Sequence, residues 1–201
     1  MEFNKDRLNW VGIWLMALNP DQRTYHKIVS AYAQNVIPAI VWIGMSGLLS
    51  YIFIAARQLL LNNTYYRDYT FIAITCTPLV VMTAFEIQLL LFSTLSYGLA
   101  KLMGGRGYIQ VQIFVFAAFM SPLNVLPSIV DLIAYFLQIP LGLTPLLWIP
   151  FGVYQTILSI IATKSVHQLN WRKAILASVP IVVLNVMTFV GNIIISSRFL
   201  N

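Results

Sequence analysis

The longest stretch without a basic residue reads GYIQVQIFVFAAFMSPLNVLPSIVDLIAYFLQIPLGLTPLLWIPFGVYQTILSIIAT (residues 107–163), and its one acidic residue is Asp131. A helix needs about 20 apolar residues to cross the hydrocarbon core of a bilayer. Three crossings would leave almost no residues for loops, whereas two leave a reasonable connection. The stretch therefore predicts two membrane-spanning helices.

The rest of the chain has the same apolar character. Of its 201 residues, 59% are hydrophobic and 9% are charged, whereas a soluble domain carries roughly 25% charged residues. This composition excludes a disordered regulator and a nucleic-acid binder, and the single Cys76 excludes a disulfide scaffold. The expected fold class is an all-α integral membrane protein with a five-helix bundle. Its predicted spans are Val36–Ala56, Phe71–Gly98, Ile109–Leu137, Thr144–Thr163 and Ala174–Ser197.

Two prolines divide the third predicted span. Pro122 and Pro127 interrupt its helix, so we expect the crossing to finish near Leu126. The following residues, Ser128–Gln138, then form a short helix at the far interface, with Asp131 in its first turn. Capping of this helix is the favoured interpretation of Asp131, and a buried functional acid is the alternative.

The positions of Lys and Arg predict the orientation, because cytoplasmic loops carry an excess of them. Nine of the twelve fall on the side of the N-terminus, and three fall on the other side. The nine are Lys5, Arg7, Arg23, Lys27, Lys101, Arg106, Lys164, Arg172 and Lys173, and the three are Arg57, Arg67 and Arg198. We therefore expect a cytoplasmic N-terminus and a C-terminus outside or in a lumen.

The chain divides into an interfacial segment, residues 1–35, and the five-span membrane domain, residues 36–201. Leu8–Leu18 is apolar but too short to cross, so it is expected in the interface. After Pro20, apolar residues recur with helical spacing, which predicts an amphipathic helix lying on the surface of one leaflet. Its apolar face holds Tyr25, Ile28, Val29 and Tyr32, and its polar face holds Arg23, His26 and Lys27.

Glu86 lies deep within the second predicted span, about 22 Å along the helix from Lys101. A charged acid at that depth costs about 3 kcal/mol, so the group is protonated, paired or facing water. One hypothesis is a proton or substrate relay. The other is a neutral acid that is hydrogen-bonded to an in-span asparagine. The candidate partners are Asn124, Asn185 and Asn192.

No arrangement of residues indicates catalysis, a cofactor or a metal site. The turn Gly104–Gly107 lacks the Gly-Lys-Ser/Thr ending of a phosphate-binding loop, so it is interpreted as a flexible turn, or as a weak contact to lipid phosphates. His167 stands in a basic inner loop and is expected to face solvent or headgroups. No second metal-ligating residue stands at metal-binding spacing from His167. We therefore expect that the protein is not an enzyme.

Several motifs point to a family. They are the turn Gly104-Gly105-Arg106-Gly107 after the second span, Pro122 inside the third, and KSVHQLNWRKA, residues 164–174, after the fourth. Together they resemble the Yip domain family, the Ypt/Rab-interacting membrane proteins and their prokaryotic relatives. The resemblance extends from about Pro20 to Ile195.

In prokaryotic members of that family the inner loop commonly reads Val-His-Gly-Leu-Ser-Trp, followed by basic residues. The present chain matches this pattern at Val166, His167, Leu169, Trp171 and Arg172. It departs from the pattern with Gln168 and Asn170. The resemblance thus implies a prokaryotic-type member in the plasma membrane. The Asp-Leu-Tyr-Gly-Pro motif of eukaryotic relatives is missing, and the short inner loops argue against a small-GTPase partner.

Two hypotheses for function follow. The first is a non-enzymatic protein of membrane organisation or trafficking, or an adaptor, that acts through its interfacial helices and basic inner loops. Its helices would be packed through small residues such as Gly44, Ser46 and Gly47. Its partners would be the bilayer, anionic lipids and either a membrane protein or a second copy of the chain. The alternative is a small permease or channel subunit, with Glu86 and the in-span asparagines lining a polar path.

Overall fold

The computed structural model describes residues 10–32, 36–61 and 70–198, and every element in them is helical. In chain order, the helices are α1 (Trp10–Ala17), α2 (Gln22–Tyr32), α3 (Ile37–Leu60), α5 (Thr70–Leu102), α6 (Ile109–Phe136), the 3₁₀ helix η1 (Leu141–Trp148), α7 (Ile149–His167), α8 (Trp171–Ala177) and α9 (Val179–Arg198).

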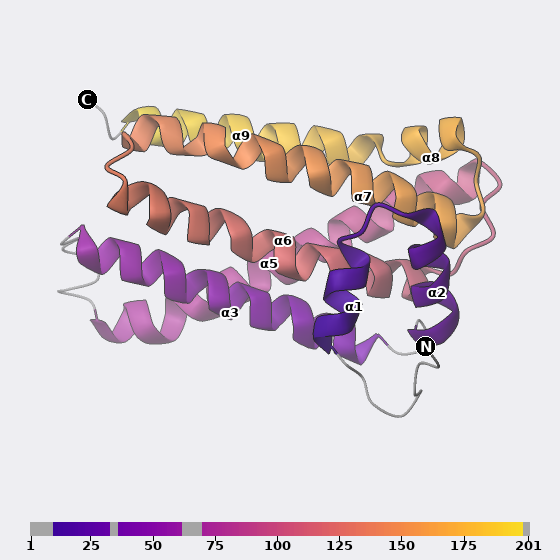
Figure 1. Ribbon diagram of the computed structural model, residues 1–201, viewed down its shortest axis with the longest axis horizontal. Helices are drawn as coiled ribbons and strands as arrows, with labels where there is room; N and C mark the ends of the chain where they lie inside the picture. The colour runs from indigo at the N-terminus through magenta and orange to yellow at the C-terminus, as the bar shows by residue number, and fades with distance from the viewer. Residues whose placement is uncertain (1–9, 33–35, 62–69, 199–201) are drawn as a thin grey trace.

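The long helices form the bundle that the hydropathy predicts (Figure 1). Four segments of the described chain are long and apolar enough to cross a membrane, and they are Ile37–Leu60, Cys76–Leu102, Ile109–Phe136 and Leu143–His167. A fifth crossing exists if α8 and α9, which meet at a bend of 42°, form one span. The prediction of an all-α membrane bundle is confirmed, and the bend is a feature that the fifth apolar window did not indicate.

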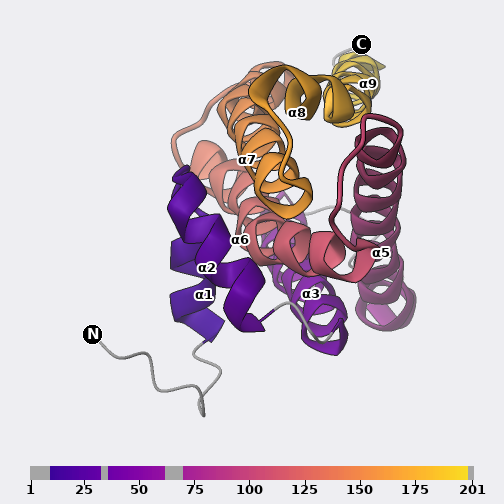
Figure 2. The same cartoon turned by 90° about the vertical axis from the view of Figure 1, so that its right-hand side faces the viewer.

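Helix α6 is the centre of the bundle. It contacts α1, α2, α3, α5, α7 and η1, and Figure 2 shows it between α5 on one flank and the α1–α2 pair on the other. Residues 114–121 of α6 are buried without interruption. A helix that is apolar and buried all round is typical of a protein core rather than of a surface that faces lipid.

Small residues bring α3 against α5, as the sequence predicted. Gly44, Ser46 and Gly47 are all buried. A Cβ built on Gly47 would lie 2.8 Å from the Cα of Met82, so only glycine fits at this crossing. The close backbone approach is the packing mode that glycine and serine permit between membrane helices.

Helix α6 continues through both prolines, so the predicted break near Leu126 and the separate helix Ser128–Gln138 are wrong. Pro127 cannot donate a hydrogen bond to the preceding turn, which normally weakens a helix there. In this turn the Asn124 carbonyl accepts a hydrogen bond of 3.1 Å from Ser50 Oγ on α3. The carbonyl that Pro127 leaves without its N–H donor is that of Leu123, so the Ser50 bond holds the backbone one residue beyond this gap, within the continuous α6.

The amphipathic pattern of α2 is confirmed, but α1 and α2 pack on the bundle instead of lying free on a leaflet. Tyr25 and Ile28 are fully buried, as is Ile13 of α1, and α2 contacts α7 and α6. The Tyr25 hydroxyl donates to the Ala17 carbonyl at 2.5 Å. Burial, with a smaller contribution from Tyr154, raises the pKa of the Tyr25 phenol well above its usual value, so this donor keeps its proton.

The fourth span begins with a 3₁₀ segment. The predicted start at Thr144 lies inside η1, and the α-helix begins at Ile149, with Pro150 in its first turn. A proline in the first turn has a backbone angle that already suits a helix, and its missing N–H would be unpaired there anyway.

Candidate functional site

Two of the three family motifs, the glycine turn and residues 164–174, meet at one end of the bundle, where α5, α7 and α8 come together with the start of α6, and Pro122 lies within α6 (Figure 1). The turn after α5 passes against the last turn of α7. Gly104 has φ +88, a left-handed conformation that suits glycine. The Arg106 amide then donates to the His167 carbonyl at 3.2 Å. The turn is therefore a docked element of the bundle and not a free loop.

Two glycines of this turn have no room for a side chain. A Cβ on Gly105 would lie 2.8 Å from the Ala100 carbonyl oxygen and 2.9 Å from His167 Nδ1. A Cβ on Gly107 would lie 2.6 Å from the Val166 carbonyl oxygen. These contacts give the glycine motif a packing role against α7. Neighbouring atoms fill the space beside its backbone at Gly105 and Gly107.

His167 is buried, with 1% of its surface exposed, so the expectation that it faces solvent or headgroups is wrong. Its Nε2 is hydrogen-bonded to the side-chain oxygen of Gln112 on α6. The Tyr97 ring of α5 lies 5.5 Å away at a tilted angle. The imidazole therefore joins three helices. Sequence reasoning missed Gln112 and Tyr97, because nothing in the spacing of one histidine indicates its partners.

The segment after His167 makes a tight turn into α8. Gln168 is left-handed with φ 55, which explains why this position is commonly glycine in the related loop. Leu169 is buried with Ala174 and Ala177. The Asn170 side chain accepts a 3.0 Å hydrogen bond from the Lys173 amide and so caps α8, a role that serine can also fill.

The same end carries the exposed basic side chains of the described residues. Arg106, Arg172 and Lys173 are exposed, and Lys164 stands 4.6 Å from the ring centre of Trp171, which is itself exposed. Lys101, Arg23 and Lys27 are exposed on elements at this end as well. The charge asymmetry that the sequence predicts is thus present as a basic surface on one end of the bundle, which we call the basic end.

Glu86 faces α3 and stands apart from the asparagines. A Cβ built on Gly44 would lie 3.3 Å from Glu86 Oε1. Asn124 donates instead to Gln88 at 3.3 Å, and Asn185 donates to Thr156 at 3.4 Å. The hydrogen bond expected between Glu86 and one of these two asparagines is therefore not formed. The side chain of Asn192 lies outside the described residues.

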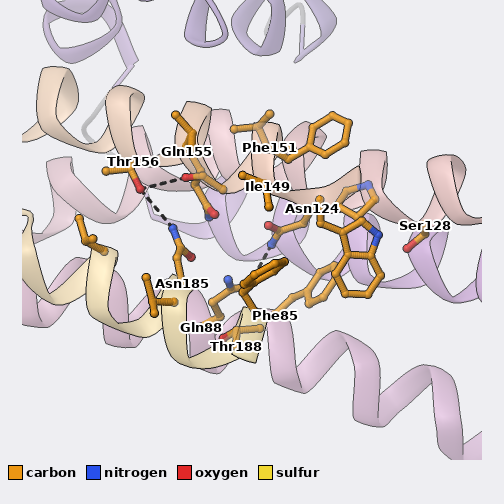
Figure 3. A pocket seen from close by; sticks show the side chains of 18 of the residues that line it. Phe85, Gln88, Asn124, Ser128, Ile149, Phe151, Gln155, Thr156, Asn185 and Thr188 are labelled. Carbon is orange, nitrogen blue, oxygen red and sulfur yellow. Dashed lines mark hydrogen bonds between the residues drawn. The ribbon is translucent and has the colours of Figure 1, made fainter. Parts of the chain in front are cut away.

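Asn124 and Asn185 do meet at a common feature, a cavity of about 630 Å³ between α5, α6, α7 and α9 (Figure 3). Apolar side chains make up most of its wall. The polar residues that line it are Gln88, Asn124, Ser128, Asp131, Gln155, Thr156, Asn185 and Thr188. Glu86 is not among the lining residues. Asn124 and Asn185 therefore lie at one site, and the glutamate belongs to another helix contact.

Asp131 also lines this cavity, and the capping interpretation of Asp131 is wrong because α6 does not begin there. Its Oδ1 accepts a 2.9 Å hydrogen bond from the indole Nε1 of Trp148. The bond joins α6 to the end of η1 near the opposite end of the bundle. In the described part of the chain, no three residues among His, Cys, Asp and Glu come together as a metal site.

The family model described as the Yip1 domain matches residues 14–192. No curated protein and no solved structure matches the chain.

Proposed function

We propose that this chain, which belongs to the Yip1 domain family, is a non-enzymatic membrane-organising or adaptor protein that acts in trafficking or membrane organisation through its basic end. The proposal includes a basic end that faces the cytoplasm of a prokaryotic plasma membrane, with the C-terminus outside. Anionic lipids are the proposed partner of that end, together with a membrane protein or a second copy of the chain.

The exposed basic side chains of the basic end carry this proposal. Arg106, Arg172 and Lys173 stand on short segments that the glycine turn and the Asn170 cap hold in place. Each basic residue close to an anionic surface contributes about 1 kcal/mol of attraction. A fixed cluster of them favours a leaflet rich in anionic headgroups. The apolar face of α2 is occupied by the bundle, whereas Val11 and Leu15 of α1 expose 61% and 67% of their surfaces, so α1 keeps an apolar side that lipid can contact.

Native mass spectrometry of the purified protein in mixed micelles of phosphatidylglycerol and phosphatidylcholine tests this proposal. We expect the protein to retain phosphatidylglycerol in preference to phosphatidylcholine. The double variant Arg106→Gln with Arg172→Gln removes about 2 kcal/mol of attraction and should lower that preference about thirtyfold. The matched control, Arg67→Gln with Arg198→Gln, removes the same charge from the side that the sequence assigns to the outside. Equal retention of both lipids by the wild type, or equal losses in the two double variants, would contradict the proposal.

A small permease or channel subunit is the second candidate function, and the cavity that contains Asn124 and Asn185 supports it. Proton flux into liposomes that hold a pH-sensitive dye tests this function. A flux above that of protein-free liposomes, reduced by Asn185→Leu, would favour it. Glu86→Gln should leave such a flux unchanged, since Glu86 does not line the cavity. Flux equal to that of empty liposomes would remove this candidate.

A further inference from the structure

The cavity between α5, α6, α7 and α9 has the size of a ligand site. Its volume of about 630 Å³ lies within the range of small-molecule pockets, roughly 300–1,000 Å³. Its walls belong to the candidate membrane-spanning segments and to α9. A molecule from the surrounding lipid can therefore reach it.

One wall of the cavity is not closed by helix packing. Helix α9 contacts α5, α7, α8 and η1, and none of the contacts between described residues joins it to α6. Val182 and Val186 of α9 line the cavity and expose 39% and 53% of their surfaces. The apolar wall at α9 is thus available to a hydrocarbon chain.

Gln155 supplies an unsatisfied donor at this site. It lines the cavity from α7 and exposes 7% of its surface, and its Nε2 has no hydrogen-bond partner. Buried donors without an acceptor are rare in proteins and often indicate a missing ligand or water. The group would be satisfied by a neutral oxygen on a molecule in the cavity (Figure 3).

The other polar groups of the wall also suit a neutral oxygen. The two side-chain bonds across the cavity, Asn124 to Gln88 and Asn185 to Thr156, are long at 3.3 and 3.4 Å and are therefore weak hydrogen bonds. No lysine or arginine stands among the lining residues. An anionic headgroup would leave its charge unpaired at this depth, which is unfavourable. Asp131, the one acidic residue of the lining, is already hydrogen-bonded to Trp148.

We propose that this cavity binds a neutral lipid with one hydrocarbon chain and a hydroxyl or ester oxygen, of the monoacylglycerol type. The chain lies along the apolar wall at α9, and the oxygen accepts a hydrogen bond from Gln155 Nε2. This site is separate from the basic end, so it goes beyond the proposed function, and either proposal can fail without the other.

Gly152 offers a direct way to block the site. It lines the cavity in α7, and a Cβ built on it meets no atom within 4 Å, so the side chain of Gly152→Leu starts in open space at the cavity wall. Gly98 is also a helical glycine with open space around its Cβ, but it does not line the cavity. Gly98→Leu is therefore the matched control. Leucine favours helix over glycine at both positions, so both variants should fold.

Photo-crosslinking of the reconstituted full chain with a photoactivatable, alkyne-tagged monoacylglycerol tests the proposal. We expect saturable labelling of peptides from α7 and α9, reduced at least tenfold by Gly152→Leu and unchanged by Gly98→Leu. Equal labelling of the wild type and Gly152→Leu would identify ordinary surrounding lipid and overturn the proposal.

A second pair of variants tests the hydrogen bond itself. Gln155→Leu removes the donor at similar size and should weaken labelling about fivefold, the effect of one hydrogen bond. Labelling by a tagged hydrocarbon of the same length without oxygen should not fall. Gln110→Leu, at an exposed position outside the cavity, is the control and should change neither probe. If Gln155→Leu reduced labelling by both probes equally, the proposed hydrogen bond between the lipid oxygen and Gln155 Nε2 would be wrong.

Discussion

The Gly105 backbone lies directly against the imidazole of His167, because a Cβ on Gly105 would stand 2.9 Å from His167 Nδ1. Sixty-two positions of sequence separate the two residues, and each belongs to a different family motif. The contact shows why both motifs occur in one chain: the glycine turn is shaped to fit over the end of α7.

Gly105→Ala is expected to destabilise the bundle. The new methyl group would stand 2.8 Å from the Ala100 carbonyl oxygen, and backbone cannot move aside as a flexible side chain does. Overpacking of this kind costs about 1–3 kcal/mol. Thermal unfolding in detergent measures the loss. Gly98→Ala, where the added carbon meets nothing, should stabilise the helix by about 0.5–1 kcal/mol, and equal behaviour of the two variants would contradict the packing role.

The His167–Gln112 pair is expected to be energetically coupled. His167→Leu leaves the buried Gln112 amide without its partner, at a cost of about 1–3 kcal/mol. Adding Gln112→Leu removes the unsatisfied group, so the double variant should be less destabilised than the sum of the single ones. A double-mutant cycle of unfolding free energies checks this. Additive losses would mean that the hydrogen bond does not matter for stability.

Gln168→Gly is expected to stabilise the protein by about 1 kcal/mol. Gln168 holds φ 55, which glycine adopts without the steric cost that a side chain incurs. Gln138, with φ 57 after α6, should respond in the same direction. Gln110→Gly, within the first turns of α6, should instead lower stability. Unfolding midpoints that move the same way at Gln168 and Gln110 would argue against the left-handed turn.

Ser50→Ala is expected to weaken the proline-containing part of α6. The variant removes the donor to the Asn124 carbonyl, at a cost of about 1 kcal/mol. Hydrogen exchange should become faster around residues 124–128 while residues 109–118 keep their protection. Ser159→Ala is a matched control, since the Ser159 hydroxyl donates only within its own helix to the Gln155 carbonyl. Uniform change along α6 would mean that Ser50 has no special part at the proline.

Hydropathy was enough to predict the long helices, because about 20 apolar residues in a row have few alternatives to a span. It could not predict the continuity of α6 through Pro127. The support comes from Ser50, on another helix and far away in the sequence. Local proline rules carry no information about such a partner.

The candidate site was only partly predictable for a similar reason. Asn124 and Asn185 were singled out as polar residues in apolar helices, and the structure places both at one cavity. His167 has a partner on α6, and Asp131 has one at Trp148, so neither role follows from the neighbouring sequence. The apolar face of α2 was readable as a pattern. The same pattern suits lipid and protein equally, and only the fold shows that α6 and α7 cover it.

The bend between α8 and α9 makes the number of crossings the most direct test of the bundle in its membrane. Single cysteines can be introduced at Arg106, Gln168, Leu61 and Arg198 after Cys76 is replaced by alanine, and then labelled in intact cells with a membrane-impermeant maleimide. Five crossings with a cytoplasmic basic end predict that Leu61→Cys and Arg198→Cys react from outside, while Arg106→Cys and Gln168→Cys react only after the membrane is opened. Labelling of Gln168→Cys and Arg198→Cys from the same side would instead make α8 and α9 a re-entrant pair and contradict the five-span bundle.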